Sequence, residues 1–245
     1  VRNGKLTFDI GKFGIRSFAV RFADTSAPAK PVQEQLLLAY DADILSDDAA
    51  RSDGRMGRSE QTLPAEMLPD TITSEGIDFA IRGREKGADN AVECRGQQIA
   101  LPAGDYDRIY LLAAAEEEAA GCFEMDGAEQ WLDIAKWKGF VGQHYAQTIV
   151  PDSTAYKTLA VDNPYLRKDP IAWFASHCHA PKRNIAYQYC YLYKYGLDIV
   201  PGAKTLTLPD NPCIKIVAVT VAKEGVRTVP LTPLYDDFDD YPVFR

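Results

Sequence analysis

The sequence has little positive charge and no long hydrophobic run. It holds 27 Lys and Arg against 35 Asp and Glu, so the formal net charge is −8 at pH 7. Nucleic-acid binding needs a clustered basic face, and anionic membranes attract polybasic segments. We therefore expect neither partner. The uncharged apolar runs, such as Ile109–Ala115, are far shorter than the ~20 residues that span a bilayer, so no membrane insertion is expected.

Cysteine pairs of the CxxC type are also missing. The five cysteines are odd in number and widely spaced: Cys94, Cys122, Cys178, Cys190 and Cys213. This spacing disfavours a zinc knuckle or a redox motif. Buried free thiols are the favoured interpretation, although Cys178 and Cys190 could meet across a hairpin.

Familiar catalytic signatures are absent too. The sequence contains no Gly-x-Ser-x-Gly elbow, no P-loop and no Rossmann glycine pattern. With so many acidic residues, a pair of carboxylates for glycosidic acid–base chemistry is always available by chance. The three histidines (His144, His177 and His179) do not by themselves support a Ser/His/Asp triad. We assign no catalytic residue.

The sequence is rich in the alternation of apolar and polar residues that is typical of β-strands. Strand-like runs recur from Lys5–Ile10 to Ile214–Val221, and turn residues such as Asp126-Gly127 separate them. Arg108–Ala115 is apolar enough for a strand buried on both faces. A short apolar strand is also expected at Gln35–Tyr40, and one helical turn at Glu116–Ala120. We expect an all-β fold: a β-sandwich of jelly-roll or galactose-binding-like type, in one or two units.

The domain organisation is expected to follow breaks in this pattern. The chain starts at Val1 with a strand-like run and no signal-peptide pattern, which suggests a piece of a longer polypeptide. Residues 1–25 would end a preceding β-rich region, and residues 32–150 would form a sandwich unit. Residues 151–245 would be a second β unit or a continuation of the same sandwich, with a boundary near Gln147–Asn163.

Two neighbouring strands carry the candidate ligand-binding residues. In Trp-Phe-Ala-Ser-His-Cys-His, strand alternation points Trp173, His177 and His179 to one face. Every second residue of the next strand is aromatic or apolar, from Ile185 to Tyr195. A hairpin of the two would place imidazoles and tyrosines on one sheet face suited to sugar rings. The candidate residues are Trp173, His177, His179, Asn184, Tyr187 and Tyr189.

Two other interpretations of this face stay open. It could instead pack against another sheet or domain, with each tyrosine hydroxyl hydrogen-bonded, and this interpretation is favoured. The His-x-His pair could also bind a metal ion, but no third ligand is identifiable in the sequence, so we assign no metal ligand.

Carboxylates cluster in the polar loop that follows Tyr40. Such a cluster suits Ca²⁺, which prefers oxygen ligands. The spacing does not match an EF-hand loop, so a solvated acidic loop is favoured over a calcium site, and no other cofactor is expected. The carboxylates concerned are Asp41, Asp43, Asp47, Asp48 and Asp53.

Four stretches resemble the C-terminal β-rich region of bacterial glycoside hydrolase family 38 proteins, the α-mannosidases. They are NGKLTFDIGKFGIRSFAVRF from Asn3, LPAGDYDRIYLLAAA from Leu101, WFASHCHAPKRNIAYQYCYLYKY from Trp173 and IVPGAKTLTLPDNPCIKIVAV from Ile199. In that family the nucleophile and metal ligands belong to an N-terminal α/β region that nothing here resembles. The resemblance therefore implies no catalytic residue in this chain, and a periplasmic or extracellular location.

The function expected from these observations is that of a non-catalytic accessory module. It would buttress the catalytic domain of an α-mannosidase-like glycoside hydrolase, its partner within the parent chain, and contact glycan. One alternative is an independent carbohydrate-binding module. A second is a sandwich-fold carbohydrate-active enzyme that uses His177, His179 and a tyrosine. A third is a purely structural interaction domain.

Overall fold

The computed structural model describes residues 7–9, 11–12, 30–143, 146–152, 155–162, 165–167 and 169–224. Most of the segment 1–25 therefore lies outside the described residues, as do His144 and the tail beyond residue 224. Among the described residues the regular secondary structure is β-strand apart from one 3₁₀ turn, and no helix there is long and apolar enough to cross a membrane.

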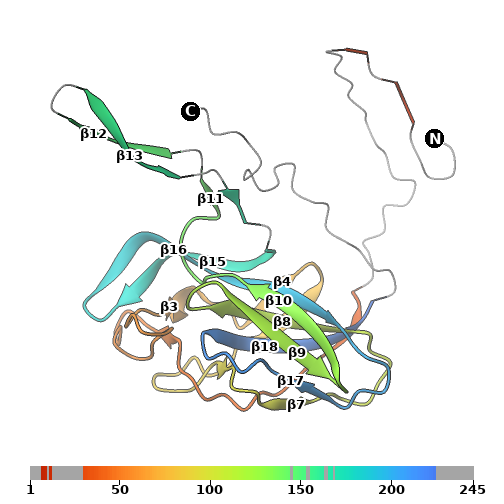
Figure 1. Cartoon of the computed structure of the whole chain (residues 1–245). Helices are drawn as coiled ribbons and strands as arrows, with labels where there is room; N and C mark the ends of the chain where they lie inside the picture. The colour runs from red at the N-terminus through yellow and green to blue at the C-terminus, as the bar shows by residue number, and fades with distance from the viewer. Residues whose placement is uncertain are drawn as a thin grey trace.

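The larger sheet forms the middle of the molecule (Figure 1). Its central strands are apolar along nearly their whole length because both of their faces are covered: β8 and β18 are buried at almost every position. The strand order is β1 (Val32–Gln35), β18 (Ile214–Lys223), β8 (Arg108–Ala115), β16 (Arg183–Asp198) and β15 (Ile171–Ala180), and β6 (Val92–Glu93) also pairs with β18.

A four-stranded sheet packs on one face of the larger sheet (Figure 1). Its inward side chains, such as Phe123 and Met125, are fully buried. The two layers pack tightly at Gly121, where a Cβ atom would lie 2.8 Å from Ile214 Cδ1. The strand order is β10 (Ala128–Ile134), β9 (Ala119–Met125), β17 (Thr205–Thr207) and β7 (Gln98–Ala100).

Shorter elements complete the fold. The hairpin of β4 (Thr71–Ser74) and β5 (Ile77–Ala80) is tied to the larger sheet by a hydrogen bond from Thr220 Oγ1 to the Asp78 carbonyl, 2.6 Å long. The 3₁₀ turn η1 (Ala65–Met67) follows β3 (Leu63–Pro64) and carries Glu66. The remaining pairs are β2 (Leu45–Ser46) with β3 (Leu63–Pro64), β4 (Thr71–Ser74) with β5 (Ile77–Ala80), β11 (Gly142–Gln143) with β14 (Tyr165–Leu166), and β12 (Ala146–Pro151) with β13 (Tyr156–Asp162).

The expected all-β sandwich is confirmed, and so are its clearest strands. The strand predicted at Arg108–Ala115 has those bounds and is buried on both faces. The turn predicted at Asp126-Gly127 joins β9 to β10, and both residues have positive φ, 48° and 81°, as a type I′ hairpin turn requires.

Two local predictions were wrong. The strand expected at Gln35–Tyr40 lies earlier, at Val32–Gln35, where the backbone pairs with the end of β18. The helical turn expected at Glu116–Ala120 is a bend that leads directly into β9, because the chain reverses there to enter the second sheet.

The division into domains stays a prediction. Strands from both sides of the expected boundary hydrogen-bond to one another in the larger sheet: β16 and β18 both pair with β8. The segment around the boundary forms the β12–β13 hairpin, which stands apart from the two sheets in Figure 1.

Candidate functional site

The predicted hairpin of candidate residues exists as β15 and β16. Directly opposed residues of an antiparallel pair share a face of the sheet. His177 lies opposite Ala186, and His179 lies opposite Asn184. The same face continues through the pair of Trp173 with Leu192.

The expectation that the imidazoles and the tyrosines share a face was wrong. Tyr191 pairs with Phe174, so this end of the tyrosine stripe lies on the opposite face from His177. The cause is the register that the hairpin turn sets: Ala180 pairs with Arg183, so odd-numbered residues of β15 lie opposite even-numbered residues of β16. The register shifts again between Ala175 and His177, but by two residues of β16, which leaves this arrangement unchanged. Tyr187 lies in the shifted segment, a bulge, and has a left-handed φ of 61°.

The inner part of the tyrosine stripe belongs to the core. Tyr191, Tyr193 and Tyr195 are at most 7% exposed, and each hydroxyl has a partner. The first two donate to the carbonyls of Gly139 and Lys136, at 2.9 and 3.2 Å. The favoured sequence interpretation, a packed face with satisfied hydroxyls, therefore holds for these three residues.

Tyr195 makes the most connected of these contacts. Its hydroxyl accepts a hydrogen bond from the Ala135 amide at 2.8 Å and donates to Asp169 Oδ1 at 3.0 Å. Burial raises the pKa of the Asp169 carboxyl above its ordinary value, and the hydrogen bond from Tyr195 only partly offsets this effect. Burial likewise raises the pKa of Tyr195, so its hydroxyl stays protonated.

The outer part of the stripe faces solvent. Tyr187 is 82% exposed and Tyr189 is half-buried. Together with Phe140, which is 65% exposed, they line a surface hollow of about 260 Å³. Gln188 adds an amide to this lining. We call this feature the aromatic hollow.

Trp173 and Asn184 lie outside the lining of the aromatic hollow. Trp173 is half-buried and its indole Nε1 donates to the Met67 carbonyl at 3.2 Å. Asn184 is exposed and its amide nitrogen donates to Asp48 Oδ1 at 2.9 Å. The structure thus divides the six candidate residues between two places on the hairpin.

The two histidines meet a carboxylate that the sequence did not reveal. Glu66, on η1, brings Oε1 to 3.1 Å from His179 Nε2 and 3.6 Å from His177 Nε2. One atom from each of the three residues lies within 4.8 Å of the other two. A backbone pairing between Thr62 and His179 brings the η1 segment to the end of β15. We call Glu66, His177 and His179 the imidazole–carboxylate cluster.

The two imidazoles differ in their surroundings. His179 is fully buried, and its Nδ1 lies 2.9 Å from the hydroxyl of Ser46, which is in turn hydrogen-bonded to the hydroxyl of Thr62. Both ring nitrogens of His179 therefore have partners. His177 Nε2 is also buried, yet it has no hydrogen-bond partner among the described residues. A buried polar atom left in this state costs stability.

The aspartates of the Asp41–Asp53 loop hold the backbone of neighbouring segments. Asp47 accepts hydrogen bonds from the amides of Ala49 and Ala50 at 2.8 and 2.7 Å, which closes a local turn. Three others bond outside or across the loop: Asp41 accepts from the Glu93 amide, Asp43 from Asn90 and the Leu45 amide, and Asp53 from the Gly87 amide. Calcium binding by this loop stays a prediction.

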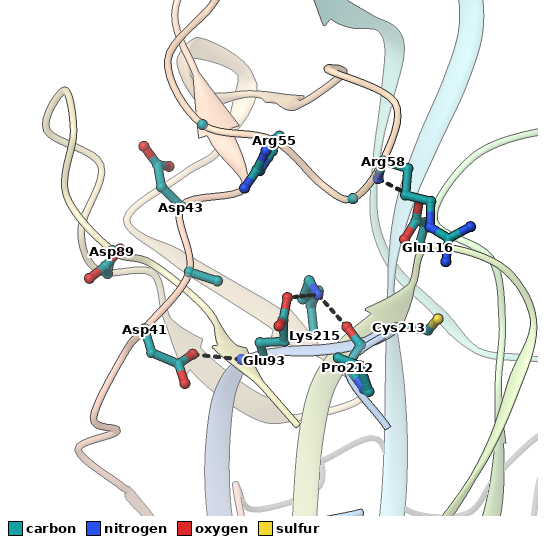
Figure 2. A pocket seen from close by; sticks show the side chains of 13 residues that line it. Asp41, Asp43, Arg55, Arg58, Asp89, Glu93, Glu116, Pro212, Cys213 and Lys215 are labelled. Atoms are coloured by element: carbon teal, nitrogen blue, oxygen red, sulfur yellow. Dashed lines mark hydrogen bonds and ion pairs between the residues drawn. The ribbon is translucent and has the colours of Figure 1, made fainter. Parts of the chain in front are cut away.

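A charged cavity of about 710 Å³ lies beside this loop (Figure 2). Gly54 in its lining has a φ of 70°, and a Cβ atom there would lie 2.5 Å from the Leu45 carbonyl oxygen, so only glycine fits. The charged lining holds five acidic and three basic residues: Asp41, Asp43, Asp89, Glu93, Glu116, Arg55, Arg58 and Lys215.

The charges around the cavity are only partly paired. Lys215 is 3% exposed and donates to the Glu93 carboxylate and the Pro212 carbonyl. Burial would raise the pKa of Glu93, but the hydrogen bonds and charges of Lys215 and Arg95 outweigh burial, so its pKa is lowered. The guanidinium of Arg55 has no ion-pair partner within the part of the chain that the structure describes.

Comparison with known families gives one match, to the AziU2-like beta-sandwich domain, over residues 32–225. The chain belongs to this family. The matched region contains both sheets and the whole of the site described above. No curated protein matches the chain. The match supports the β-sandwich and carries no link to glycoside hydrolase family 38.

Sequence reasoning missed three contributors to the sites of this AziU2-like domain. Glu66 lies more than a hundred positions before the histidines, and nothing in its own segment marks it as their neighbour. Phe140 belongs to a stretch without a clear strand pattern, although it lines the aromatic hollow. Arg55 lies in a loop that reads only as polar.

Proposed function

We propose that this AziU2-like domain is a non-catalytic accessory module that contacts glycan at the aromatic hollow. The observation that carries the proposal is the exposure of Tyr187 and Phe140 beside Tyr189 and the Gln188 amide. The C–H face of a sugar ring stacks on an aromatic plane, and its hydroxyls need hydrogen-bonding groups nearby. The hollow offers both.

The backbone at Tyr187 supports a role beyond packing. A non-glycine residue at a φ of 61° carries strain of order 1–3 kcal/mol, and such strain is often found at functional sites. Burial of the Tyr187 side chain offsets little of this strain, because the residue is 82% exposed. The bulge instead presents the ring outward.

Within a longer protein, the module would buttress a catalytic domain and hold glycan near it. The resemblance to the C-terminal region of α-mannosidase-like glycoside hydrolases motivates this placement and a periplasmic or extracellular location. Binding without turnover is the expected behaviour of the chain by itself.

Titration of the chain with mannosides and other oligosaccharides, followed by protein-observed NMR, tests the proposal. We expect saturable shifts at Tyr187, Gln188 and Phe140. Removal of one stacking ring in Tyr187→Ala should weaken binding about 2- to 13-fold, because an aromatic contact contributes roughly 0.5–1.5 kcal/mol. Trp131→Ala is the matched control: its ring is 66% exposed on β10, away from the hollow, and its loss should change nothing.

Two results would contradict this function. One is the absence of shifts with every sugar at millimolar concentration. The other is equal loss of binding in Tyr187→Ala and Trp131→Ala, which would indicate non-specific contact. Hydrolysis of aryl mannosides by the chain alone would favour the enzyme alternative instead.

The charged cavity supports a second candidate: binding of a small ligand with an anionic group, such as a sugar acid. The specific observation is the Arg55 guanidinium, which lines the cavity without an ion-pair partner in the described part of the chain. An arginine of this kind can hold a carboxylate with two parallel hydrogen bonds. If NMR shifts appear around Asp43 and Arg55 and are lost in Arg55→Gln, the ligand occupies this cavity rather than the aromatic hollow.

A further inference from the structure

We propose that Glu66, His177 and His179 bind a divalent first-row transition metal ion, with Zn²⁺ as the best-suited probe. Two imidazole nitrogens and one carboxylate oxygen are a donor set that Zn²⁺ prefers, whereas Ca²⁺ and Mg²⁺ prefer oxygen alone. The inference is independent of glycan binding.

The spacing of the three residues fits a metal centre. Zinc lies about 2.0–2.2 Å from nitrogen and oxygen ligands, so two ligands of a tetrahedral ion are about 3.3 Å apart. Glu66 Oε1 is 3.1 Å from His179 Nε2 and 3.6 Å from His177 Nε2. All three donor atoms lie within 4.8 Å of one another, so small side-chain rotations bring them onto one ion.

An independent observation is the buried nitrogen of His177. Its Nε2 is hidden from solvent and has no hydrogen-bond partner among the described residues. It points at the carboxylate oxygen that His179 already approaches more closely. A cation among the three atoms would satisfy this nitrogen and neutralise the carboxylate at once, so the arrangement has a physical reason.

The surroundings prepare His179 for a metal. With a metal ion on Nε2, the ring proton would sit on Nδ1 and donate to Ser46 Oγ, 2.9 Å away. Fixing the distant nitrogen of a ligating histidine in this way sets its tautomer and orientation. The Asp48 carboxylate, 3.6 Å from His179 Nε2, adds negative charge that favours a cation.

Three protein ligands would leave at least one coordination position for water. Glu66 also lines an open surface hollow of about 380 Å³ with Asp70, Arg84 and Glu85, which gives solvent access to the carboxylate. Sites with three protein ligands and an open position are typical of zinc ions that take part in ligand binding or chemistry.

The test is calorimetric titration of the whole chain, stripped with a chelator, with ZnCl₂, and with CaCl₂ in parallel. We expect one Zn²⁺ site and no comparable Ca²⁺ binding. His177→Ala and Glu66→Gln should each weaken Zn²⁺ binding at least about tenfold, since loss of even an outer partner typically costs 10- to 100-fold. Glu85→Gln is the matched control, because its carboxylate lies in the same hollow but outside the cluster.

Co²⁺ binding provides a second measurement. It uses the unmodified chain and therefore does not depend on whether a substituted chain folds. Its visible absorption spectrum in the unmodified chain should show the intense bands of a tetrahedral nitrogen–oxygen site, and added Zn²⁺ should remove them. His179→Ala is avoided because it would remove a buried hydrogen-bond partner of the Ser46 hydroxyl.

Clear outcomes overturn the proposal. If the chain takes up no Zn²⁺, or if Glu66→Gln binds Zn²⁺ as tightly as the unmodified chain and Glu85→Gln do, no metal site exists here. Uptake that is abolished by blocking the free cysteines, and unchanged in Glu66→Gln, would assign the ion to the thiols instead.

Discussion

The two ends of β16 share a pattern of alternating tyrosines but differ in burial. The inner end, Tyr191–Leu197, is almost wholly buried, and its tyrosine hydroxyls all have partners. The outer end, Arg183–Tyr189, is exposed and contains the left-handed Tyr187. Alternating tyrosines thus indicate a strand but not its environment. The environment depends on what covers the strand, here the chain segment of residues 135–139.

The strongest contrast should be in stability. Tyr193 is fully buried, so Tyr193→Ala should lower the free energy of unfolding by about 3–5 kcal/mol through lost burial and a cavity. Tyr187→Ala removes an exposed ring and should change it by less than about 0.5 kcal/mol. Urea unfolding followed by circular dichroism measures both. Similar losses in the two variants would mean that the outer end is part of the core.

A smaller effect on stability, an increase in the free energy of unfolding, is expected at the bulge. Tyr187→Gly should raise the free energy of unfolding by about 1 kcal/mol, because glycine adopts a φ of 61° without strain but gives up some chain entropy. Tyr187→Ala keeps the unfavourable φ and serves as the control. Both variants should lose glycan contact, so Tyr187→Gly would be more stable and less able to bind. A destabilised Tyr187→Gly would show that the ring itself holds the bulge together.

The weakest of the three effects concerns pH. Burial raises the pKa of Asp169 in the folded state above its ordinary value of 3.8. The folded chain therefore holds this proton more tightly than the unfolded chain, so the contribution to stability is present at low pH and is lost as the pH rises through the folded pKa.

Asp169→Asn removes that dependence while keeping an oxygen that can accept from the Tyr195 hydroxyl. Relative to the unmodified chain, the variant should gain stability as the pH rises above 3.8, measured as the difference between thermal midpoints across the pH series. Asp70→Asn, at an exposed carboxylate, is the control and should leave the profile unchanged. A profile that Asp169→Asn does not alter would contradict the raised pKa.

Much of the fold could be predicted because side chains in a strand alternate between its two faces every second residue. Arg108–Ala115 is long, apolar and bounded by turn residues, so its burial on both faces follows from composition. The turn at Asp126-Gly127 could be predicted because few residue pairs tolerate two positive φ values. Val32–Gln35 was missed because its strand character comes from pairing with β18, not from its own alternation.

The candidate site was less predictable, for two physical reasons. The turn after Ala180 sets the register of the hairpin, and a difference of one residue there moves a whole strand's side chains to the other face, so the imidazoles were placed on the wrong side. The position of Glu66 beside His179 depends on how the loop after β2 folds back onto β15, which is a long-range contact without a local signal. The histidines could be found from their spacing, whereas their third partner could not.

The position of β18 has a consequence for biosynthesis. It is the last described strand in the chain, yet it lies inside the larger sheet, between β1 and β8. While the protein is being made, β1 and the inner edge of β8 therefore have no partner until residues 214–223 leave the ribosome. The larger sheet cannot assemble from its N-terminal side onward, and it must close in a late step that joins β1 to β18. Nascent chains that stop before residue 214 would expose two unpaired strand edges, so this domain should depend on chaperones most until β18 has been synthesised.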